Sequence, residues 1–349
     1  MWNKKKYNVI IRTEGGSSIG MGHLVRCLAL ADMLKYDFNI SFAIQQPNEQ
    51  LIDAIHSVTS NIINLPETDN FHKDVLNFIK YLDPIDIAVL DGYNFKTSYQ
   101  KAIKEKGKTL VCIDDLHAFH FYADAIINVS DSVSSNDYSS ESYTRYFLGS
   151  NYALLRDPFL NSSRKPARII KLIDEVFISM GGTDINNITL KILKAIQPST
   201  SIKKVHIVIG SVNLHEHSLE KYIKANVTST KVLLHKNIDA QELNSLICDC
   251  QIAICPASGI SLEAVSVGVG IISGYTADNQ LGILNGLVKK ECILNAGDFN
   301  KLSVEKITKI IEIYISNIDV VNEMVKKQKK LIDGLSPQRF ISIFNELCK

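Results

Sequence analysis

The order of apolar and polar residues changes its period repeatedly along the chain. Short runs rich in Val, Ile and Phe alternate with segments in which apolar residues recur at helical spacing, as they do over 24–34. In the first half, the runs that predict strands are 8–12, 40–44, 85–90, 110–113, 125–129 and 146–148. This alternation is typical of parallel sheets whose strands are joined through helices, and it predicts an α/β protein.

The segment 161–168 is polar, contains a proline and interrupts this pattern, which makes it the best candidate for a linker. The alternation then restarts, with predicted strands at 176–179, 205–209, 232–234, 252–255 and 270–273 and amphipathic helices at 320–331 and 338–347. We therefore predict an N-terminal domain over 1–160, a C-terminal domain over 168–335 and a final helix over 336–349, for which packing back on the first domain is one option. Open parallel sheets bind ligands outside the carboxyl ends of their strands, so the two sheets are expected to face a central cleft.

Composition narrows the class of partner. The 349 residues include 38 Lys and Arg against 37 Asp and Glu, a net charge of +1, so no overall field favours nucleic acid or an anionic membrane. No apolar window approaches the roughly 20 residues of a membrane span, and the first residues lack the apolar core of a signal peptide. The seven cysteines form no set with the spacing of a zinc site. We expect a cytoplasmic protein with no stable membrane insertion, no bound metal and no cofactor.

A glycine-rich loop follows the first predicted strand and leads directly into a helix. It contains Gly20 and Gly22 and ends at His23, where the helix opens. Glycines permit a close approach of the backbone to a ligand, and a helix N-terminus favours anions. Histidine is the side chain whose unperturbed pKa suits a general base near neutral pH, so His23 is the candidate for that role. The alternative is a glycine-rich turn capped by a histidine, which the loop alone does not exclude.

A second loop of this kind, 180–184, follows the predicted strand that ends at 179. Gly181, Gly182 and Thr183 lie in it, just before another helix, and could hold a phosphate without a lysine. The alternative is an ordinary turn in which Thr183 or Asp184 caps the helix.

Two further loops lie in the third quarter of the chain. Ser258 and Gly259 could face a diphosphate, and Glu263, expected on the first turn of the next helix, could accept hydrogen bonds from both ribose hydroxyls. Alternatively, Glu263 only interacts with the helix dipole. The segment that contains Asn279 and Gln280 follows another strand and caps a further helix.

Polar residues also follow two strands of the first half, at the edge where function is expected. They are Asp91, Gly92 and Tyr93 after one strand and the pair Asp114 and Asp115 after another. Adjacent residues on an extended chain point in opposite directions, so at least one aspartate of the pair is expected to be structural. His117 and His120 have no partner at metal-ligand spacing.

Taken in order, these loops carry a resemblance to a known family. The matching segments are Arg12-Thr-Glu14, Ile19-Gly-Met-Gly-His23 with Arg26, Asp91-Gly-Tyr93, Ile113-Asp-Asp115, Ile127-Asn-Val129, Leu148-Gly-Ser-Asn-Tyr-Ala-Leu-Leu-Arg156, Met180-Gly-Gly-Thr-Asp184, Glu263 and Asn279-Gln280. Together they resemble the UDP-2,4-diacetamido-2,4,6-trideoxy-β-L-altropyranose hydrolases of pseudaminic acid biosynthesis, over nearly the whole chain. The resemblance implies a GT-B fold of two Rossmann-like domains, related to the MurG-like glycosyltransferases.

The resemblance also implies roles for individual residues. His23 would activate water for attack at the anomeric carbon, with Tyr93 beside it, and UDP would leave by C–O cleavage without a metal. The residues implied to bind the substrate are Arg12, Glu14, Gly20, Gly22, Arg26, Asn279 and Gln280. Those implied to hold UDP are Gly181, Gly182, Thr183, Ser258, Gly259 and Glu263.

One departure from the family pattern stands near the implied base. The family has Arg-x-Asp at the end of the first strand, whereas this chain has Arg12-Thr13-Glu14, which is one methylene longer at the acidic position. The identity of the sugar therefore stays open. Separately, the sequence leaves the oligomeric state open, and a monomer is a plausible state. Two other functions fit the same residues: a glycosyltransferase in which His23 deprotonates an acceptor hydroxyl, and a catalytically silent protein that binds a nucleotide sugar.

Overall fold

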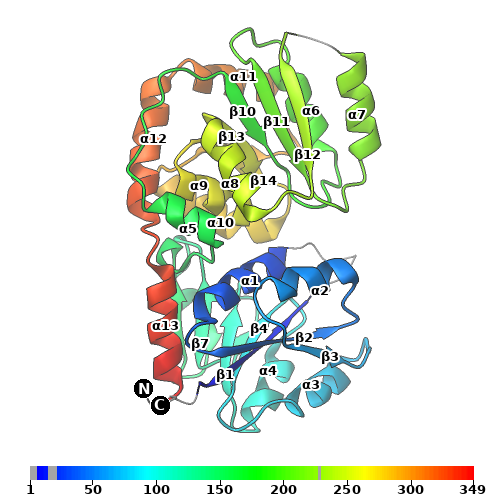
Figure 1. Ribbon diagram of the computed structural model, residues 1–349. Helices are drawn as coiled ribbons and strands as arrows, with labels where there is room; N and C mark the ends of the chain where they lie inside the picture. Colours follow the sequence, from blue (N-terminus) through cyan, green and yellow to red (C-terminus); the bar gives the residue numbers. More distant parts are fainter. Residues whose placement is uncertain (1–5, 15–21, 227–228) are drawn as a thin grey trace. The chain divides into compact units, whose positions relative to one another are not determined.

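The computed structural model describes residues 6–14, 22–226 and 229–349, which form two compact α/β units (Figure 1). The first, called here the N-terminal unit, consists of Met1–Arg156 and Leu335–Lys349. The second, the C-terminal unit, consists of Asp157–Gly334. Each has its own parallel sheet and its own hydrophobic core, so the α/β class predicted from the apolar pattern is confirmed.

The sheet of the N-terminal unit has seven strands in the order β3-β2-β1-β4-β5-β7-β9, all of them parallel. The strands are β1 (Asn8–Thr13), β2 (Asn39–Gln45), β3 (Ile62–Leu65), β4 (Ile87–Asp91), β5 (Thr109–Ile113), β7 (Ala125–Asn128) and β9 (Arg145–Leu148). A separate pair is formed by β6 (His120–Phe121) and β8 (Ser139–Ser140). The strand order reverses between β1 and β4, and that reversal leaves a gap between the connections of the two strands, where open sheets bind ligands.

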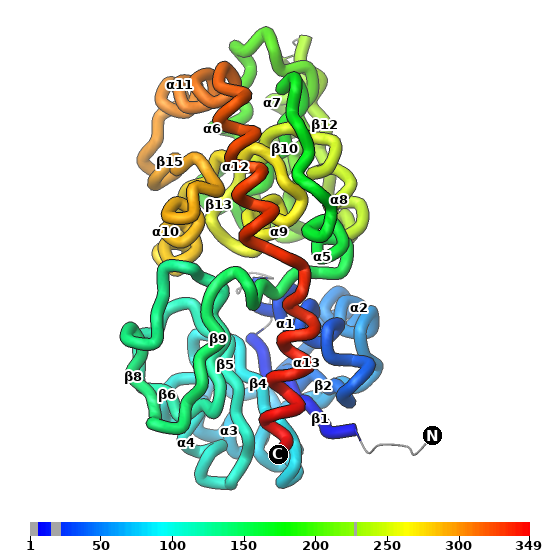
Figure 2. Tube along the Cα trace, turned by 90° about the vertical axis from the view of Figure 1, so that its left-hand side faces the viewer, coloured from blue at the N-terminus to red at the C-terminus, as the bar shows by residue number. Residues whose placement is uncertain are grey.

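Helices cover both faces of this sheet. They are α1 (Gly22–Leu34), α2 (Glu49–His56), α3 (Phe71–Ile79), α4 (Thr97–Lys104) and α13 (Ser336–Leu347), with short 3₁₀ turns η1 (Ser135–Asp137) and η2 (Ser150–Tyr152). Right-handed crossovers put α1 and α2 on one face and α3 and α4 on the other, because the chain moves along the sheet in one direction through α1 and α2 and in the opposite direction through α3 and α4. The final helix, α13, lies against α1, as Figure 2 shows, and the rings of Phe38 and Phe344 meet there at 5.9 Å between centroids.

The C-terminal unit repeats this plan with six parallel strands in the order β12-β11-β10-β13-β14-β15. The strands are β10 (Glu175–Ile178), β11 (Lys204–Ile209), β12 (Lys231–Lys236), β13 (Ile252–Pro256), β14 (Gly270–Tyr275) and β15 (Leu294–Asp298). The helices are α5 (Asp157–Ser163), α6 (Ile188–Ile196), α7 (Glu216–Ala225), α8 (Ala240–Asp249), α9 (Gly259–Val267), α10 (Leu281–Lys289), α11 (Val304–Ile315) and α12 (Ile318–Leu331), and η3 (Asp278–Gln280) is a 3₁₀ turn. Here the strand order reverses between β10 and β13.

The residues expected to form a linker are part of the C-terminal unit. The first of them, 161–163, complete α5, which the predicted boundary at residue 160 would divide and which packs against α8 and α9. Arg168 donates hydrogen bonds to the carbonyl oxygens of Cys248 and Cys250, at the end of α8. A helix leaves its last carbonyl groups without partners, and the guanidinium of Arg168 satisfies two of them.

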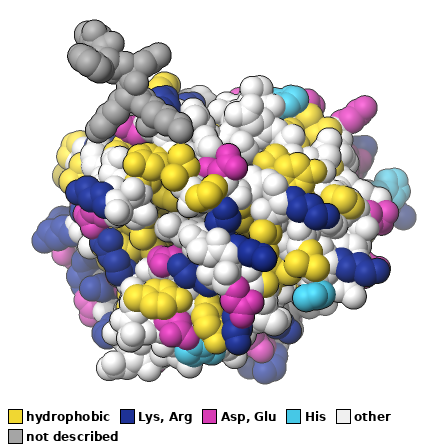
Figure 3. Space-filling model, turned by 90° about the horizontal axis from the view of Figure 1, so that it is seen from below, with side chains coloured by type: hydrophobic (Ala, Val, Ile, Leu, Met, Phe, Trp, Pro, Cys, Tyr) yellow, Lys and Arg dark blue, Asp and Glu magenta, His cyan; other side chains and the backbone are white. Residues whose placement is uncertain are grey.

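The apolar runs became strands because both faces of each sheet are covered. Residues such as Val9, Ile11, Val89 and Val111 are fully buried, which is possible only where helices lie above and below the strand. On the face shown in Figure 3, Lys and Arg side chains are mixed with Asp and Glu, so that face has no block of one sign. Among the described residues, no helix is both long and apolar enough to cross a membrane.

Candidate active site

Three strand ends of the N-terminal unit stand side by side at the reversal of the strand order. Thr13 at the end of β1 pairs in register with Asp91 at the end of β4, and Asp91 pairs with Ile113 at the end of β5. The residues that follow these positions therefore emerge at one edge of the sheet. Parallel open sheets bind ligands at this edge.

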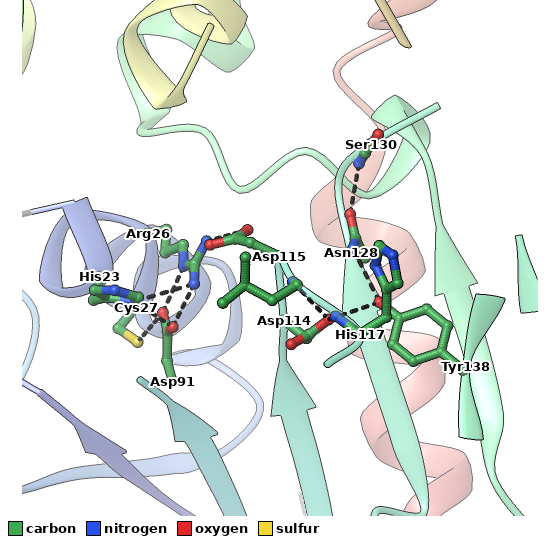
Figure 4. Close-up of polar contacts among 11 residues, drawn as sticks. His23, Arg26, Cys27, Asp91, Asp114, Asp115, His117, Asn128, Ser130 and Tyr138 are labelled. Atoms are coloured by element: carbon green, nitrogen blue, oxygen red, sulfur yellow. Dashed lines mark hydrogen bonds and ion pairs between the residues drawn. The ribbon is translucent and has the colours of Figure 1, made fainter. Parts of the chain in front are cut away.

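His23 is the second residue of α1 and is held by the carboxylate of Asp91 (Figure 4). Its Nδ1 lies 2.7 Å from Oδ1 of Asp91 and 3.1 Å from a guanidinium nitrogen of Arg26. A carboxylate only accepts and a guanidinium only donates, so one Nδ1 cannot bond to both. The shorter contact, made to the charged acceptor, assigns the proton to Nδ1. Nε2 is then the basic nitrogen, in the arrangement by which an aspartate orients a catalytic histidine.

Asp91 is fully buried and receives three kinds of donor. Besides His23, Arg26 donates from Nε at 2.6 Å and from a terminal nitrogen at 2.5 Å, and the Cys27 thiol donates at 3.3 Å. Burial by itself would raise the pKa of Asp91, but the charge and hydrogen bonds of Arg26, with a smaller contribution from His23, lower it to about 2. Asp91 is therefore ionised at neutral pH although it has no contact with solvent.

Arg26 connects this carboxylate to a second one. Its other terminal nitrogen donates to both oxygens of Asp115, at 2.7 and 2.8 Å. Burial would lower the pKa of Arg26, and the two aspartates together raise it well above its usual value, so the arginine stays charged. The planar guanidinium thus fixes the positions of two strand ends relative to α1.

A narrow pocket of about 20 Å³ opens beside these groups. Its lining residues are His23, Arg26, Gly92, Tyr93, Ile113, Asp114, Asp115, Leu116 and Phe119. The ring of Tyr93 stands edge-on to His23, with 4.7 Å between ring centroids. The site thus combines an oriented histidine, an aromatic hydroxyl, two carboxylates and an apolar wall.

Asp114 has a structural role, which agrees with the expectation for one member of the aspartate pair. Its carboxylate accepts from the backbone amides of Leu116 at 3.1 Å and His117 at 2.7 Å and from the hydroxyl of Tyr138 at 3.0 Å. Burial raises the pKa of Asp114, and these hydrogen bonds lower it in part. Asn128 supports the same hydroxyl (Figure 4). The wall of the pocket is held in place by this network.

Arg12, implied by the resemblance to bind the substrate, lies in a buried ion pair. Two of its nitrogens contact Asp74 on α3 at 3.2–3.4 Å, and its guanidinium lies over the ring of Phe95. Asp74 also accepts from Tyr99 at 2.7 Å and from Gln45. The side chain of Arg12 is 7% exposed and does not line the pocket. In this structure Arg12 joins β1 to the helices on one face of the sheet.

Glu14 also makes its contacts within the protein. Its carboxylate accepts from the backbone amides of Tyr93 at 3.2 Å and Asn94 at 3.1 Å, and the residue is 8% exposed. Gly22, the first residue of α1, is exposed, and a Cβ placed on it would meet no atom of the described residues within 4 Å. Gly20, predicted to bind the substrate, lies outside the described residues.

The loop after β10 in the C-terminal unit contains the cap of the helix that follows it. Asp184 accepts from the backbone amides of Ile188 at 2.8 Å and Thr189 at 3.0 Å and so caps α6. The N-terminus of α6 already has an anionic partner within the chain. Gly181 adopts φ +85°, and a Cβ on it would meet no described residue within 4 Å. Gly182 packs against Gly210, whose added Cβ would lie 2.6 Å from it. Thr183 is half-buried.

The N-terminus of α9 offers more space. Ser258 is the N-cap residue, and within the part of the chain that the structure describes its side chain makes no capping hydrogen bond and a Cβ on Gly259 would meet no atom within 4 Å. The expectation that Glu263 lies on the first turn is wrong: α9 begins at Gly259, its first turn has no acidic residue, and Glu263 is 6% exposed on the second turn. The helix begins earlier than the sequence suggested, at Gly259 directly after the extended Ser258, so Glu263 lies one turn further along it.

Asn279 and Gln280 lie in η3, before α10. The side-chain oxygen of Gln280 accepts from the backbone amide of Thr276 at 2.8 Å, which closes the loop after β14. Asn279 is half-buried. Among the described residues, no group of three or more His, Cys, Asp or Glu side chains is placed to hold a metal ion.

Sequence reasoning placed Asp91 and Asp115 at the functional edge of the sheet but did not include them among the site residues. The signal that could have found Asp91 is its position at the end of the strand that pairs with β1 across the reversal, next to the loop that ends at His23. Asp115 could have been paired with Arg26, because an arginine one turn after His23 faces the same edge.

Comparison with curated proteins finds relatives at low identity. The chain is 28% identical over 289 residues to the UDP-2,4-diacetamido-2,4,6-trideoxy-β-L-altropyranose hydrolase of Campylobacter jejuni, covering 81% of this chain and 96% of that protein. It is 25% identical over 347 residues to the spore coat polysaccharide biosynthesis protein SpsG of Bacillus subtilis, covering 97% and 98%. A match at 26% to an uncharacterised protein of Methanocaldococcus jannaschii covers 81% of this chain and 58% of that longer protein. No family model matches the chain.

Solved structures identify the fold. The MurG structure from Acinetobacter baumannii matches with a TM-score of 0.67 at 12% identity, covering 97% of this chain and 99% of that one. A UDP-glucosyltransferase from Polygonum tinctorium matches with a TM-score of 0.68 at 12% identity, covering 99% of each. The chain therefore has the GT-B fold, as its resemblance to the hydrolase family implied.

Proposed function

We propose that the chain hydrolyses a UDP-linked sugar, UDP-2,4-diacetamido-2,4,6-trideoxy-β-L-altropyranose or a close relative of it. The observation that carries the proposal is the 2.7 Å contact between Nδ1 of His23 and Asp91 at the mouth of a pocket. Sequence similarity to the Campylobacter jejuni hydrolase, over nearly all of that protein, supports the choice of substrate.

His23 acts as the general base in this proposal. Nε2 takes a proton from water, the water oxygen attacks the anomeric carbon, and the bond from that carbon to the phosphate oxygen breaks. The electron pair of that bond leaves with UDP, so the products are the free sugar and UDP. A nucleoside diphosphate is a good leaving group, so the step requires an oriented base more than an acid.

Asp91 and Arg26 prepare His23 for this step. With Asp91 ionised, the imidazolium that forms after proton transfer faces a negative charge, while Arg26 keeps that charge in place. This arrangement is formed before the reaction and needs no reorganisation when the proton moves. Tyr93, whose ring contacts His23, restricts the imidazole to one orientation.

The C-terminal unit supplies the UDP site in this proposal. Gly181 lies in the loop after β10, and Ser258 and Gly259 lie where the segment after β13 enters α9, on the two sides of the strand-order reversal in that sheet. The space in front of Gly181 and Gly259 supports the approach of a phosphate to the backbone there. Because Asp184 already caps α6, we assign the diphosphate to the N-terminus of α9.

The reaction can be tested with labelled water. Purified protein is incubated with the UDP-diacetamido-trideoxy-altrose in oxygen-18 water, with EDTA and no acceptor, and the products are examined by mass spectrometry. We expect label in the sugar and none in UDP, as C–O cleavage requires. Free sugar incubated alone in the same water corrects for exchange of its anomeric oxygen. Label in UDP would contradict the mechanism, because water would then have attacked phosphorus.

Substitution of the histidine tests the assigned role. His23→Gln should lose turnover and keep UDP binding, since UDP is held by the other unit. The matched control is His56→Ala, an exposed histidine at the end of α2, which should leave both unchanged. Unchanged turnover in His23→Gln would remove His23 from the mechanism. If the wild type releases UDP only when an alcohol acceptor is added, the same dyad serves a glycosyltransferase, the second function that these residues fit.

A further inference from the structure

The carboxylate of Glu14 lies against the turn that follows β4. It accepts from two successive amides of that turn, Tyr93 at 3.2 Å and Asn94 at 3.1 Å, while the amide of Glu14 donates to the carbonyl oxygen of Asp91 at 3.2 Å. Three hydrogen bonds thus join the end of β1 to the segment 91–94. That segment contains both Asp91, which orients His23, and Tyr93, which contacts its ring.

Gly92 shows how tightly this contact is packed. A Cβ on Gly92 would lie 2.6 Å from Cγ and Cδ of Glu14 and 2.9 Å from its Oε2. An alanine at 92 would therefore displace the Glu14 side chain from its contacts with the turn. With 8% of its surface exposed and both oxygens engaged by amides, Glu14 is directed at the turn.

We propose that Glu14 is a positioning residue: it holds the turn formed by residues 91–94, and it acts on the reaction through Tyr93 and Asp91 of that turn. This inference rests on the proposed function. It replaces the role of substrate ligand that the resemblance implied for this position. It also explains the longer acidic side chain: a carboxylate one methylene shorter would not reach the amides of Tyr93 and Asn94 from the same backbone position, since a side-chain hydrogen bond is lost beyond about 3.5 Å.

Three variants test the proposal: Glu14→Gln, which keeps one acceptor oxygen, Glu14→Asp, which shortens the reach, and Glu14→Ala. Hydrogen exchange of the peptide containing residues 91–94 should speed up in the order Gln, Asp, Ala. In turnover, kcat should fall by about tenfold to a hundredfold in Glu14→Ala, as expected for a misplaced catalytic group, with KM changed less than about threefold. Glu14→Gln should recover most of kcat.

A double-mutant cycle with Gly92 gives a second test. Gly92→Ala should lower kcat strongly in the wild type and less in the Glu14→Asp background, where the shorter side chain leaves space for the added methyl group. The matched control is Asp86→Ala, another buried carboxylate, which accepts from the amide of Asp83 at the opposite end of β4. It should reduce stability without changing kcat or the exchange of residues 91–94.

The outcomes separate the two proposals. Hydrogen exchange does not depend on turnover, so a wild type without hydrolase activity would refute the proposed function and still test Glu14. Unchanged exchange at Tyr93 and Asn94 in Glu14→Ala would overturn the positioning role. A rise in KM with unchanged kcat would also overturn it, because that result identifies a substrate ligand.

Discussion

Replacement of Asp91 by asparagine removes the charge at the centre of the candidate site with little change in shape. The amide group can offer its NH₂ to Nδ1 of His23, and Nδ1 must then accept, which moves the imidazole proton to Nε2. In that tautomer the nitrogen that should take a proton from water already carries one. The substitution therefore affects both the stability of the N-terminal unit and the base.

The cost in stability follows from the burial of the group. A pKa lowered from 3.8 to about 2 in a fully buried side chain corresponds to about 2 kcal/mol of preference for the charged form. Loss of one partner from a buried ion pair costs roughly 3–5 kcal/mol. Because Arg26 keeps its two hydrogen bonds to Asp115, we expect a loss near the lower figure, about 2–3 kcal/mol.

We expect the Asp91→Asn substitution to reduce kcat by more than its loss of folding stability alone would. In enzymes where an aspartate orients a catalytic histidine, the same substitution lowers kcat by about 10⁴, and we expect a fall on the order of 10³ to 10⁴ here. UDP release is measured under single-turnover conditions, and urea unfolding gives the fraction of folded protein for correction. Asp86→Asn, a buried aspartate just before β4, is the control: it should lose stability and keep kcat. A corrected kcat for Asp91→Asn within tenfold of the wild type would refute the assignment of the dyad.

Three further outcomes follow from the same contacts. Because the pKa of Asp91 is lower in the folded state, its contribution to stability is complete above pH 3.8 and is lost as the pH falls towards about 2. The urea midpoints measured at pH 5 and at pH 3 should therefore differ more for the wild type than for Asp91→Asn. Equal differences in the two proteins would contradict this. Arg12→Met should destabilise the protein by roughly 3–5 kcal/mol, and the second substitution Asp74→Asn should recover part of that loss. The kcat per folded molecule should stay unchanged. A selective loss of kcat would identify Arg12 as a substrate ligand. Asp184→Ala should cost about 1–2 kcal/mol in urea unfolding through loss of the α6 cap, with Asp184→Asn intermediate; no loss would mean that the cap is not formed in solution.

Much of the fold could be predicted because the strands are buried on both faces. Continuous apolar runs located eleven strands of the two large sheets within one or two residues. The two that were not predicted, β3 (Ile62–Leu65) and β15 (Leu294–Asp298), lie at sheet edges and are short or contain Asn, Gly and Asp. Edge strands need less apolar surface, so the apolar pattern indicates them weakly.

The candidate site was predictable only in part, since its contacts depend on which strands become neighbours. His23 followed from its position between a glycine-rich loop and a helix. Its partner, Asp91, is 68 residues further along the chain. The two side chains meet because β4 pairs with β1 and not with β3, the strand that precedes β4 in the sequence. Arg12 shows the opposite case: a charged residue at a strand end suggested a ligand site, but a carboxylate on α3 that no local pattern connects to it became its partner.

The position of α13 in the N-terminal unit has a consequence for synthesis on the ribosome. The helix that carries His23 and Arg26 packs against residues that are translated only after the whole C-terminal unit. Domains usually fold in the order in which they emerge. Here the contiguous C-terminal unit can finish folding first, whereas α1 can pack against α13 only after the last residues have been translated. A chain released early, before residue 335, would lack the support of the helix that bears the base, so nascent fragments of this protein should be inactive even when they contain every residue of the pocket.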